Sequence, residues 1–454
     1  MITRILGYLL LLLTLTIVTL NFYENTFLTF LSQAVTWCLL VAAVFTTRSF
    51  GRLVASVLMV AGILLFLWNG SSAIGSMFSA ITFNVGIIAI MASVPLIGIA
   101  IRVGGYLRAI KQKTLLERDH GGRSRTYRIS NLIVISLAPF LNVGAIYITK
   151  DIAFKALDKF HQKRLGMLLF RGFATSFYWS PFAASVILIT DLMETRWSSI
   201  FGYLLIGVVI HLLLSWALFK ITAFRDDEWV EQRAGSNVTT DPKRINQKIG
   251  RLVLIMTALV ALAVALEMVT GWSMVVVIIV LAFGYCFFWM LALQKAKRFL
   301  VAAFRYFGRS FLQVRNEIML FVSAGFFGSA LSQSPLHEHV DQMFVYIGEL
   351  PTLWFVVILF AVFIGVGQLG IHAVVLVTLI GNAVDGNFFP DNPLFLPIVL
   401  VFGIMLYNQT SPFSAITVIT ANLFKINPFM VIRKNVLFCG LLFITLTAVL
   451  LLIR

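Results

Sequence analysis

The sequence predicts an all-α polytopic membrane protein, built as an inverted-topology repeat with two opposed re-entrant hairpins and two proline-broken helices. Three observations predict this fold: a membrane-like composition, basic residues confined to alternate loops, and a repeat at an offset of about 230 residues. Of the 454 residues, 60% are hydrophobic and 12% are charged, whereas soluble domains have about 45–50% and about 25%. At roughly 20 apolar residues for each spanning helix, the chain can cross a membrane about ten to thirteen times. This composition excludes a soluble enzyme, a DNA-binding protein and a disordered chain.

The charged residues are grouped in a few loops between apolar runs, so the net charge of +16 indicates membrane topology rather than a nucleic-acid partner. Three loops are strongly basic: 102–128 with eight Lys and Arg residues, 220–251 with seven, and 295–315 with six. The apolar runs cover about 5–22, 27–46, 53–69, 80–101, 128–193, 198–220, 252–269, 273–294, 316–333, 352–425 and 435–453.

The positive-inside rule places the N-terminus and the three basic loops in the cytoplasm, and the C-terminus outside, in the cytoplasmic (inner) membrane of the cell. The first run has the outline of a signal peptide, but no small-residue cleavage site follows it, so we expect it to be kept as a span. The basic loops all fall on the cytoplasmic side only if two segments do not cross the membrane. Segment 128–163 must enter from the cytoplasm and return to it, and segment 352–391 must enter from outside and return there. The sequence therefore predicts eleven full spans and two hairpins of opposite orientation.

Three short segments recur in the same order in the two halves of the chain. Because the paired segments run in opposite directions across the membrane, they predict an inverted-topology repeat, which is the build of many secondary transporters. The pairs are Ser93–Ala100 with Ser323–Ala330, Phe140–Ala145 with Gln368–Ala373, and Trp179–Ala184 with Thr410–Ala415, at offsets of 230, 228 and 231.

The repeat and the topology together predict a division of the chain into scaffold and repeat regions. Each repeat contains one hairpin followed by one broken helix. The predicted regions are N-terminal scaffold spans in 1–79; repeat 1 in 80–220, with the cytoplasmic-side hairpin 128–163 and the broken helix 164–193; a cytoplasmic loop in 221–251; scaffold spans and a basic interfacial segment in 252–315; and repeat 2 in 316–454, with the outer-side hairpin 352–391, the broken helix 392–425 and a last span.

Pro181 and Pro412 occupy equivalent places in the two repeats, each after a serine and before a phenylalanine. Proline inside a helix removes a backbone hydrogen bond and clashes with the preceding turn. Each one therefore predicts either a plain kink or a discontinuous helix whose ends point at a substrate or an ion. The hairpin tips contain glycines, which suit either sharp unpaired turns or close helix packing.

Polar side chains gather at these tips and breaks, and polar groups at membrane depth are often functional. Serine and threonine can instead bond to their own helix carbonyls, and His372 can be a neutral packing residue. A histidine titrates near pH 6.5 when unperturbed, so His372 is also a candidate proton carrier. Arg171 either extends toward the cytoplasmic surface or holds an anion. The candidate substrate-binding residues are Asn142, Ser180, Gln368, His372, Thr410 and Ser411, and the candidate ion-coupling residues are Asn142 and His372.

Two hairpins, each followed by a proline-broken helix, resemble the ion transporter superfamily, as does the helix 316–331 before the outer hairpin. That superfamily includes divalent-anion/sodium symporters, citrate carriers, arsenite and sodium/proton antiporters, and the membrane subunit of tripartite dicarboxylate transporters. The resemblance covers about 80–194 and 316–425. It implies a scaffold domain, a moving transport domain, a homodimer and an elevator mechanism.

The divalent-anion branch of that superfamily has Ser-Asn-Thr at both hairpin tips. In this chain the first tip matches that motif only at Asn142, and the second has Gly370-Ile371-His372 in its place. The resemblance therefore implies one sodium site at Asn142 and the carbonyls near Ser180. It does not extend to a second sodium site with side-chain ligands.

We therefore expect a secondary active transporter that moves a small, carboxylate-type anion by alternating access. We expect its coupling ion to be Na⁺ or H⁺, and its partners to be membrane lipid and a second copy of the chain. We expect no nucleic-acid partner, no metal and no other cofactor. The alternatives are a translocator of a lipid phosphate or a lipid-linked intermediate, and an ion/proton antiporter. No paired carboxylates or metal-ligand spacing are found at membrane depth, so an enzyme is not expected. The shortage of carboxylates there favours an anionic substrate.

Overall fold

The protein crosses the membrane many times. Its structure, a computed structural model, describes residues 1–47, 50–69, 73–118, 123–141, 144–156, 159–219, 229–231, 241–384, 389 and 391–454. In these residues, ten helical stretches are long and apolar enough to cross a membrane. They coincide with ten of the eleven predicted spans, so the chain is a multi-pass membrane protein.

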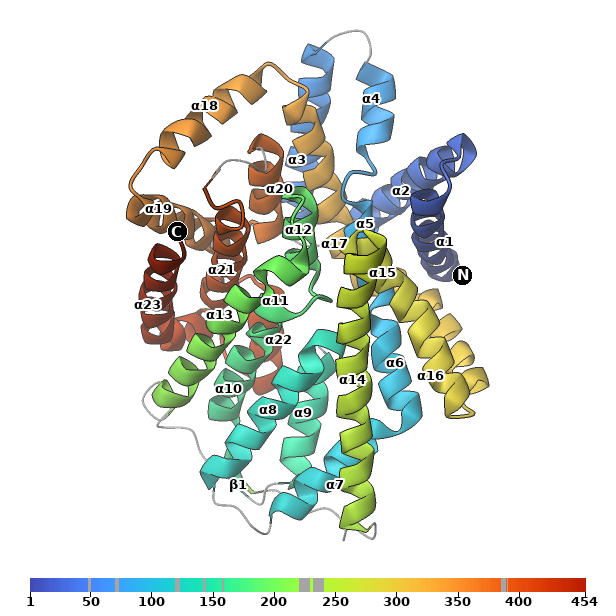
Figure 1. The fold of residues 1–454 in the computed structure, drawn as a ribbon, viewed down its shortest axis with the longest axis vertical. Helices are drawn as coiled ribbons and strands as arrows, with labels where there is room; N and C mark the ends of the chain where they lie inside the picture. Colours follow the sequence, from blue (N-terminus) through green and yellow to red (C-terminus); the bar gives the residue numbers. More distant parts are fainter. Residues whose placement is uncertain are drawn as a thin grey trace.

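The N-terminal part consists of helices that pack along one side of the molecule, with α1 and α2 close to the N-terminus in Figure 1. The Asn25 side chain accepts the N–H of Leu28 and so starts α2. Gly105, at φ 80°, ends α6 in the left-handed conformation that glycine adopts freely. These helices are α1 (Ile2–Phe22), α2 (Thr26–Thr46), α3 (Phe50–Trp68), α4 (Ala73–Ala80), α5 (Val85–Ser93), α6 (Pro95–Gly104) and α7 (Tyr106–Arg118).

The first hairpin and the first broken helix follow. The two hairpin arms pack against each other, and both rise from the end of the molecule drawn at the bottom of Figure 1. The elements are α8 (Arg123–Leu141) and α9 (Gly144–Ala156) for the hairpin, α10 (Gln162–Ala174), α11 (Ser176–Trp179) and α12 (Ala184–Leu192) for the broken helix, and then α13 (Trp197–Leu218).

The central part contains the two longest helices that the structure describes. Asp241 caps the first of them and Pro242 fills its first turn, where a missing N–H is harmless. The elements are α14 (Pro242–Thr270), α15 (Met274–Val280), the short π-helix η1 (Leu281–Tyr285), α16 (Cys286–Ala292), α17 (Ala296–Ser332) and α18 (Leu336–Gly348).

Segment 295–315, predicted as a basic loop, is instead helical and forms the first half of α17. The eleventh predicted span, 316–333, is the second half of the same helix. The reason is amphipathicity: Phe299, Phe307 and Phe311 share one face and are 3%, 2% and 0% exposed, so this face packs inward while the basic residues stay outside.

The second hairpin and the second broken helix complete the fold. The preceding helix, α18, lies at the end of the molecule opposite to the base of the first hairpin (Figure 1). The elements are α19 (Thr352–Gln368) and α20 (Ala373–Ala383) for the hairpin, α21 (Phe395–Thr410) and α22 (Ala415–Phe424) for the broken helix, and α23 (Pro428–Ile453).

One small β-sheet departs from the all-α prediction. Strands β1 (Lys159–His161) and β2 (Trp229–Glu231) pair antiparallel at the bottom end of the molecule. Most of the predicted loop 221–251 lies outside the described residues, apart from β2 and the start of α14. Strands this short carry no periodic signal, and only their pairing defines them.

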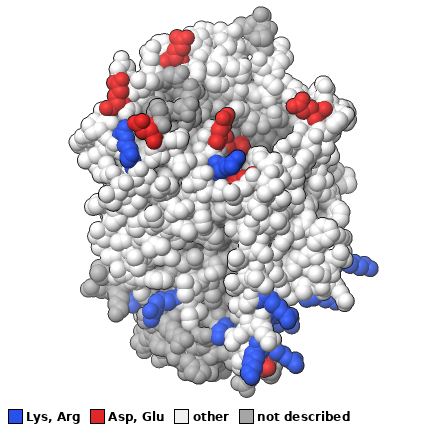
Figure 2. All heavy atoms as spheres, viewed as in Figure 1, with Lys and Arg blue, Asp and Glu red and all other residues white. Residues whose placement is uncertain are grey.

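Charged side chains divide between the two ends of the molecule. In the face drawn in Figure 2, acidic side chains gather at the top and basic ones at the bottom, with a wide uncharged band between them. A few basic side chains accompany the acidic ones at the top. This is the distribution of a protein whose middle lies in lipid.

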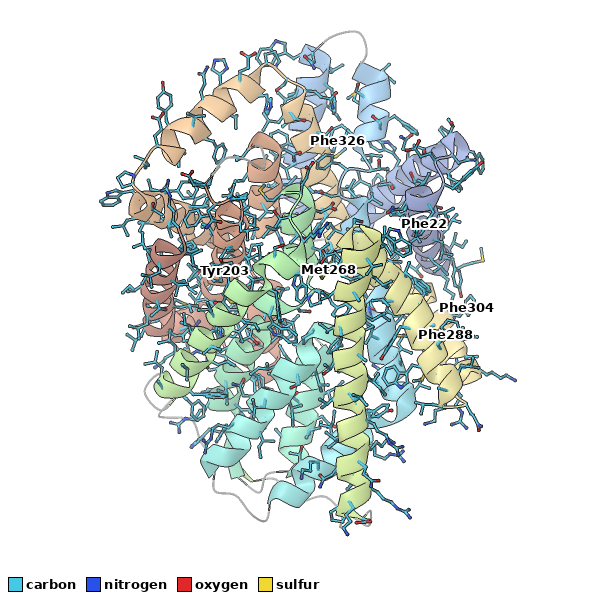
Figure 3. The ribbon with its side chains drawn as sticks, viewed as in Figure 1. Phe22, Tyr203, Met268, Phe288, Phe304 and Phe326 are labelled. Carbon is cyan, nitrogen blue, oxygen red and sulfur yellow. The ribbon has the colours of Figure 1, made fainter. Side chains whose placement is uncertain are left out.

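Large apolar side chains cover the outer surface of the helices. Phe288 and Phe304, labelled in Figure 3, are 67% and 58% exposed, as expected for side chains that face lipid. Phe326 is fully buried and lies 5.3 Å, centroid to centroid, from the ring of Phe66. The chain therefore has an apolar exterior as well as an apolar core.

Candidate functional site

Both predicted helix breaks and the second hairpin tip meet at one cavity of about 180 Å³. Its wall also includes the end of α8, beside the first tip, and the junction of α5 and α6. The elements that form it lie in the middle of the molecule in Figure 1, away from both charged ends. A cavity of this size is smaller than the roughly 300–1,000 Å³ that drug-sized ligands occupy, so it fits a small solute.

The first break begins at Ser180, where the backbone leaves the helix at φ −75°, ψ 124°. The Ser180 Oγ accepts the N–H of Phe182 at 3.1 Å and is completely buried. Helix α12 then starts without a side-chain cap. In the described part of the chain, no acceptor meets the N–H groups of Ala184 and Ser185, or the buried hydroxyl of Ser185. Both residues line the cavity, so three hydrogen-bond donors without an acceptor lie at its wall.

The second break repeats this geometry. Ser411 leaves the helix at φ −80°, ψ 122°, and its Oγ accepts the N–H of Phe413 at 3.2 Å. Ser414 caps α22 by accepting the N–H of Thr417. The N-terminal residues Ala415 and Ile416 line the cavity. Pro181 and Pro412 therefore produce discontinuous helices rather than plain kinks.

The second hairpin tip is tied to the second break by two reciprocal hydrogen bonds. Gln368 Nε2 donates to the carbonyl of Thr410 at 2.7 Å, and Ser411 Oγ donates to the carbonyl of Gly367 at 2.7 Å. We call this pair the tip-to-break bonds. Gly370 turns the tip at φ 77°, a conformation that favours glycine.

His372 is the N-cap of α20 and lines the cavity. Its Nδ1 accepts the N–H of Val374 at 3.2 Å, which fixes the lone pair on that atom. The proton of the neutral ring is therefore on Nε2. The ring lies about 6 Å from those of Phe321 and Tyr407, which also line the cavity.

Of the six predicted substrate residues, the structure brings Ser180 and His372 to the cavity. Gln368 is exposed, and Gln368 and Ser411 form the tip-to-break bonds. Thr410 donates to the Leu406 carbonyl of its own helix, which is the alternative stated for serine and threonine. Asn142 lies outside the described residues; beside it, the Phe140 ring lies 5.4 Å from Phe182 at the first break.

Arg171 does not reach the surface, being only 2% exposed. Its Nε donates to Asn435 Oδ1 at 2.8 Å, and its guanidinium lies 4.4 Å from the ring of Phe438. Asn435 in turn donates to the side chain and the carbonyl of Gln409. The arginine therefore joins α10 to α23 and α21, and it is not among the residues that line the cavity.

One cavity residue, Glu317 on α17, is not among the candidates that the sequence predicts. The expected shortage of carboxylates at membrane depth is wrong at this position. The sequence places Glu317 in the first turn of the predicted span 316–333, directly after a basic loop, whereas α17 starts 21 residues earlier and carries it to the cavity. One sequence feature singles Glu317 out as a candidate site residue: it is the only acidic residue in the segment that forms α17.

The cavity can hold a small anion chemically. Three helix N-termini, those of α12, α20 and α22, contribute to its wall and carry partial positive charge. The first two N–H groups of α12 and of α22 have no acceptor in the described part of the chain, whereas those of α20 are bonded to Tyr407 and His372. In the described part of the chain, no cluster of three or more His, Cys, Asp or Glu residues could hold a metal ion.

No protein-family model and no curated protein sequence matches the chain. Among solved structures, the chain is similar to the YdaH transporter of Alcanivorax borkumensis, with a TM-score of 0.47 and 11% sequence identity. The alignment covers 84% of this chain and 86% of that one, which is described as having an unusual topology.

Proposed function

We propose that this protein is a secondary active transporter that moves a small carboxylate-type anion across the cytoplasmic membrane by alternating access, driven by an ion gradient. The observation that carries the proposal is the convergence of three helix N-termini on one cavity, whose elements lie in the middle of the molecule in Figure 1. In lipid, unpaired backbone groups are tolerated only where they are buried in protein or line a wet cavity.

The charge distribution supports the predicted orientation, with the basic end of Figure 2 in the cytoplasm. The inverted repeat receives support from the matching backbone geometry of Ser180 and Ser411. The elevator mechanism, the homodimer and membership of the ion transporter superfamily remain predictions.

Uptake into proteoliposomes tests the proposal. A panel of radiolabelled organic anions, including succinate and citrate, would be offered with and without sodium and proton gradients. We expect saturable, gradient-driven accumulation of at least one soluble anion. If every anion on the panel is excluded under both gradients, the proposed substrate class is wrong.

Ala184 offers a matched pair of variants for the anion site. Ala184→Asp puts a carboxylate at the free N-terminus of α12, in the place proposed for the substrate, and Ala184→Asn is its neutral counterpart. The free N–H groups at this N-terminus offset part of the cost of placing a carboxylate there, and thermal unfolding in detergent checks that both variants fold. We expect uptake to be lost in the Asp variant and largely kept in the Asn variant. Equal uptake by both would show that no anion binds there.

One observation favours the alternative of a lipid-type substrate. A groove of about 720 Å³ runs between the first hairpin and α14, and its lining includes Ile133, Met256 and Val260. At one end it reaches Phe140 and Trp179, next to the first break. This groove could take an acyl chain while a headgroup occupies the cavity.

Thr257→Trp, a substitution that fills the groove, separates the two candidates. A lipid translocator would lose transport of a fluorescent lipid phosphate in this variant. A carrier of soluble anions would keep its uptake.

A further inference from the structure

Glu317 is the one carboxylate among the cavity-lining residues that the structure describes. Its Oε2 is buried and has no hydrogen-bond partner in the described part of the chain. The carboxylate accepts a hydrogen bond from its own backbone N–H, which offsets only part of the cost of burial. A buried ionised carboxylate with no charged partner is costly, so such a group takes up a proton or a cation.

The surroundings of Glu317 contain few other titratable groups. Those lining the cavity are His372 and Tyr407. The adjacent helix α5 carries none, and α20 carries none beyond its N-cap. Arg315, on the same helix, is two residues away and so points in a different direction. Helix α18, which has His337 and Glu338 in its first turn, starts 19 residues beyond Glu317. The other helices packed against α17 carry one buried titratable group, the thiol of Cys286. Their remaining titratable side chains are at exposed positions: Arg4, Tyr8, Cys38, Arg52 and Arg102.

We propose that Glu317 binds the coupling proton, and that substrate anion enters the cavity only when this carboxyl group is neutral. The inference rests on the proposed function above. At about 4 Å and an effective dielectric constant of about 20, a second negative charge weakens binding roughly a thousandfold. The proton comes from water on the side to which the cavity is open and is released to water on the other side. No bond other than the O–H bond is made or broken.

The geometry assigns this role to Glu317 rather than to His372. The Nδ1 of His372 already accepts the N–H of Val374 and so holds the first turn of α20. Protonation at that atom would break this bond and leave two donors facing each other. His372 can instead donate from Nε2 while remaining neutral, which suits a substrate-binding group.

Infrared difference spectroscopy tests proton binding without any substrate. Spectra of the purified full-length protein in liposomes would be recorded at alkaline and acidic pH. We expect a carboxylic-acid band to appear on acidification, and to be absent from Glu317→Gln. Glu267→Gln is the matched control, since the Oε2 of Glu267 is likewise buried without a hydrogen-bond partner in the described residues, but its Oε1 accepts the N–H of Trp197 and Glu267 does not line the cavity. If the Glu317→Gln spectrum keeps the band, or if the band responds to sodium instead of pH, the inference is wrong.

Transport of succinate, or of whichever panel anion the wild type takes up, gives an independent measurement. Glutamine resembles a protonated glutamate, so Glu317→Gln should retain exchange of labelled for unlabelled anion and lose at least tenfold in proton-driven accumulation. In His372→Gln the uptake rate should fall, because a substrate-binding group is lost, but the ratio of uptake with and without the proton gradient should match that of the wild type. Unchanged proton-driven accumulation in Glu317→Gln would overturn the inference while leaving the proposed function intact. If the wild type moves no anion, the proposed function fails, and the infrared result alone decides whether Glu317 binds the proton.

Discussion

Truncating Gln368 should open the second hairpin more than truncating Ser411, although Gln368 is exposed and Ser411 is fully buried. The two side chains make the tip-to-break bonds, so Gln368→Ala and Ser411→Ala each remove one of them. Alternating access requires the tip and the break to separate at some stage. Both variants should therefore raise the fraction of molecules with the hairpin open.

The difference in magnitude follows from what each carbonyl retains. In Ser411→Ala, the Gly367 carbonyl keeps a second hydrogen bond, from the N–H of Gly370 at 3.3 Å. This variant therefore loses one net hydrogen bond, about 0.5–1.5 kcal/mol, which raises the open fraction about 2- to 13-fold. The Thr410 carbonyl has no second donor in the described part of the chain. Gln368→Ala leaves this carbonyl unpaired, which costs about 1–3 kcal/mol and raises the open fraction about 5- to 150-fold. Ser411→Ala also removes the hydrogen bond from the Phe413 N–H. That bond lies within the break and is made in both the closed and the open hairpin, so its loss does not change the balance between them.

A cysteine at position 373 reports the opening, because Ala373 lines the cavity and is only 2% exposed. The rate of its reaction with a polar maleimide would be measured in liposomes, after replacing the exposed Cys38 with serine. The control is Ser310→Ala, which removes a buried 2.9 Å bond to a carbonyl of the same helix and should leave the rate unchanged. If Ser411→Ala reacts faster than Gln368→Ala, or if neither differs from the control, the reasoning is refuted.

Three further predictions concern packing, buried polarity and topology. In Gly403→Ala the new methyl group would overlap a phenyl ring of α19, which should destabilise the protein by about 1–3 kcal/mol. In Gly440→Ala the methyl group meets no neighbour, so this variant should be neutral or stabilising. Thermal unfolding in detergent compares the two variants. Asn435→Leu removes the acceptor of a buried guanidinium N–H and should cost about 1.5–3 kcal/mol in the same assay, and an unchanged unfolding temperature would contradict the proposed link between α10 and α23. In a background without the exposed native cysteine, an impermeant reagent outside intact cells should label Gln342→Cys and not Lys243→Cys, and the opposite pattern would reverse the orientation.

The breaks were predictable from the sequence because their cause is local. A proline after a serine removes a backbone hydrogen bond wherever it occurs, so Pro181 and Pro412 fix the ends of α11 and α21. The spans were predictable for the same reason, since length and hydropathy are properties of contiguous residues.

Glu317 and Ser185 were not predictable, because lateral packing decides what each helix presents to the cavity. Serine is common in membrane helices, and nothing in its neighbours shows that the Ser185 hydroxyl has no acceptor. The apparent start of a span at residue 316 concealed Glu317, because the basic half of α17 reads as a loop when charge is the criterion. The substrate-binding roles of Gln368 and Ser411 stay predictions, and the structure shows a different use for both side chains. Both are polar and near the tip, but they bond to the protein itself.

The unbroken length of α17 makes the two halves of the molecule mechanically unequal. Its 37 residues form a rod of about 55 Å, which transmits a displacement at its basic end to the cavity without bending. Its predicted counterpart in the first half is divided into α5 and α6 at Val94, because Pro95 cannot donate a hydrogen bond. A helix interrupted by proline bends more readily than an unbroken one. We therefore expect α5 and α6 to change their mutual angle under a load that α17 passes along its axis, so the two halves of the molecule differ in stiffness.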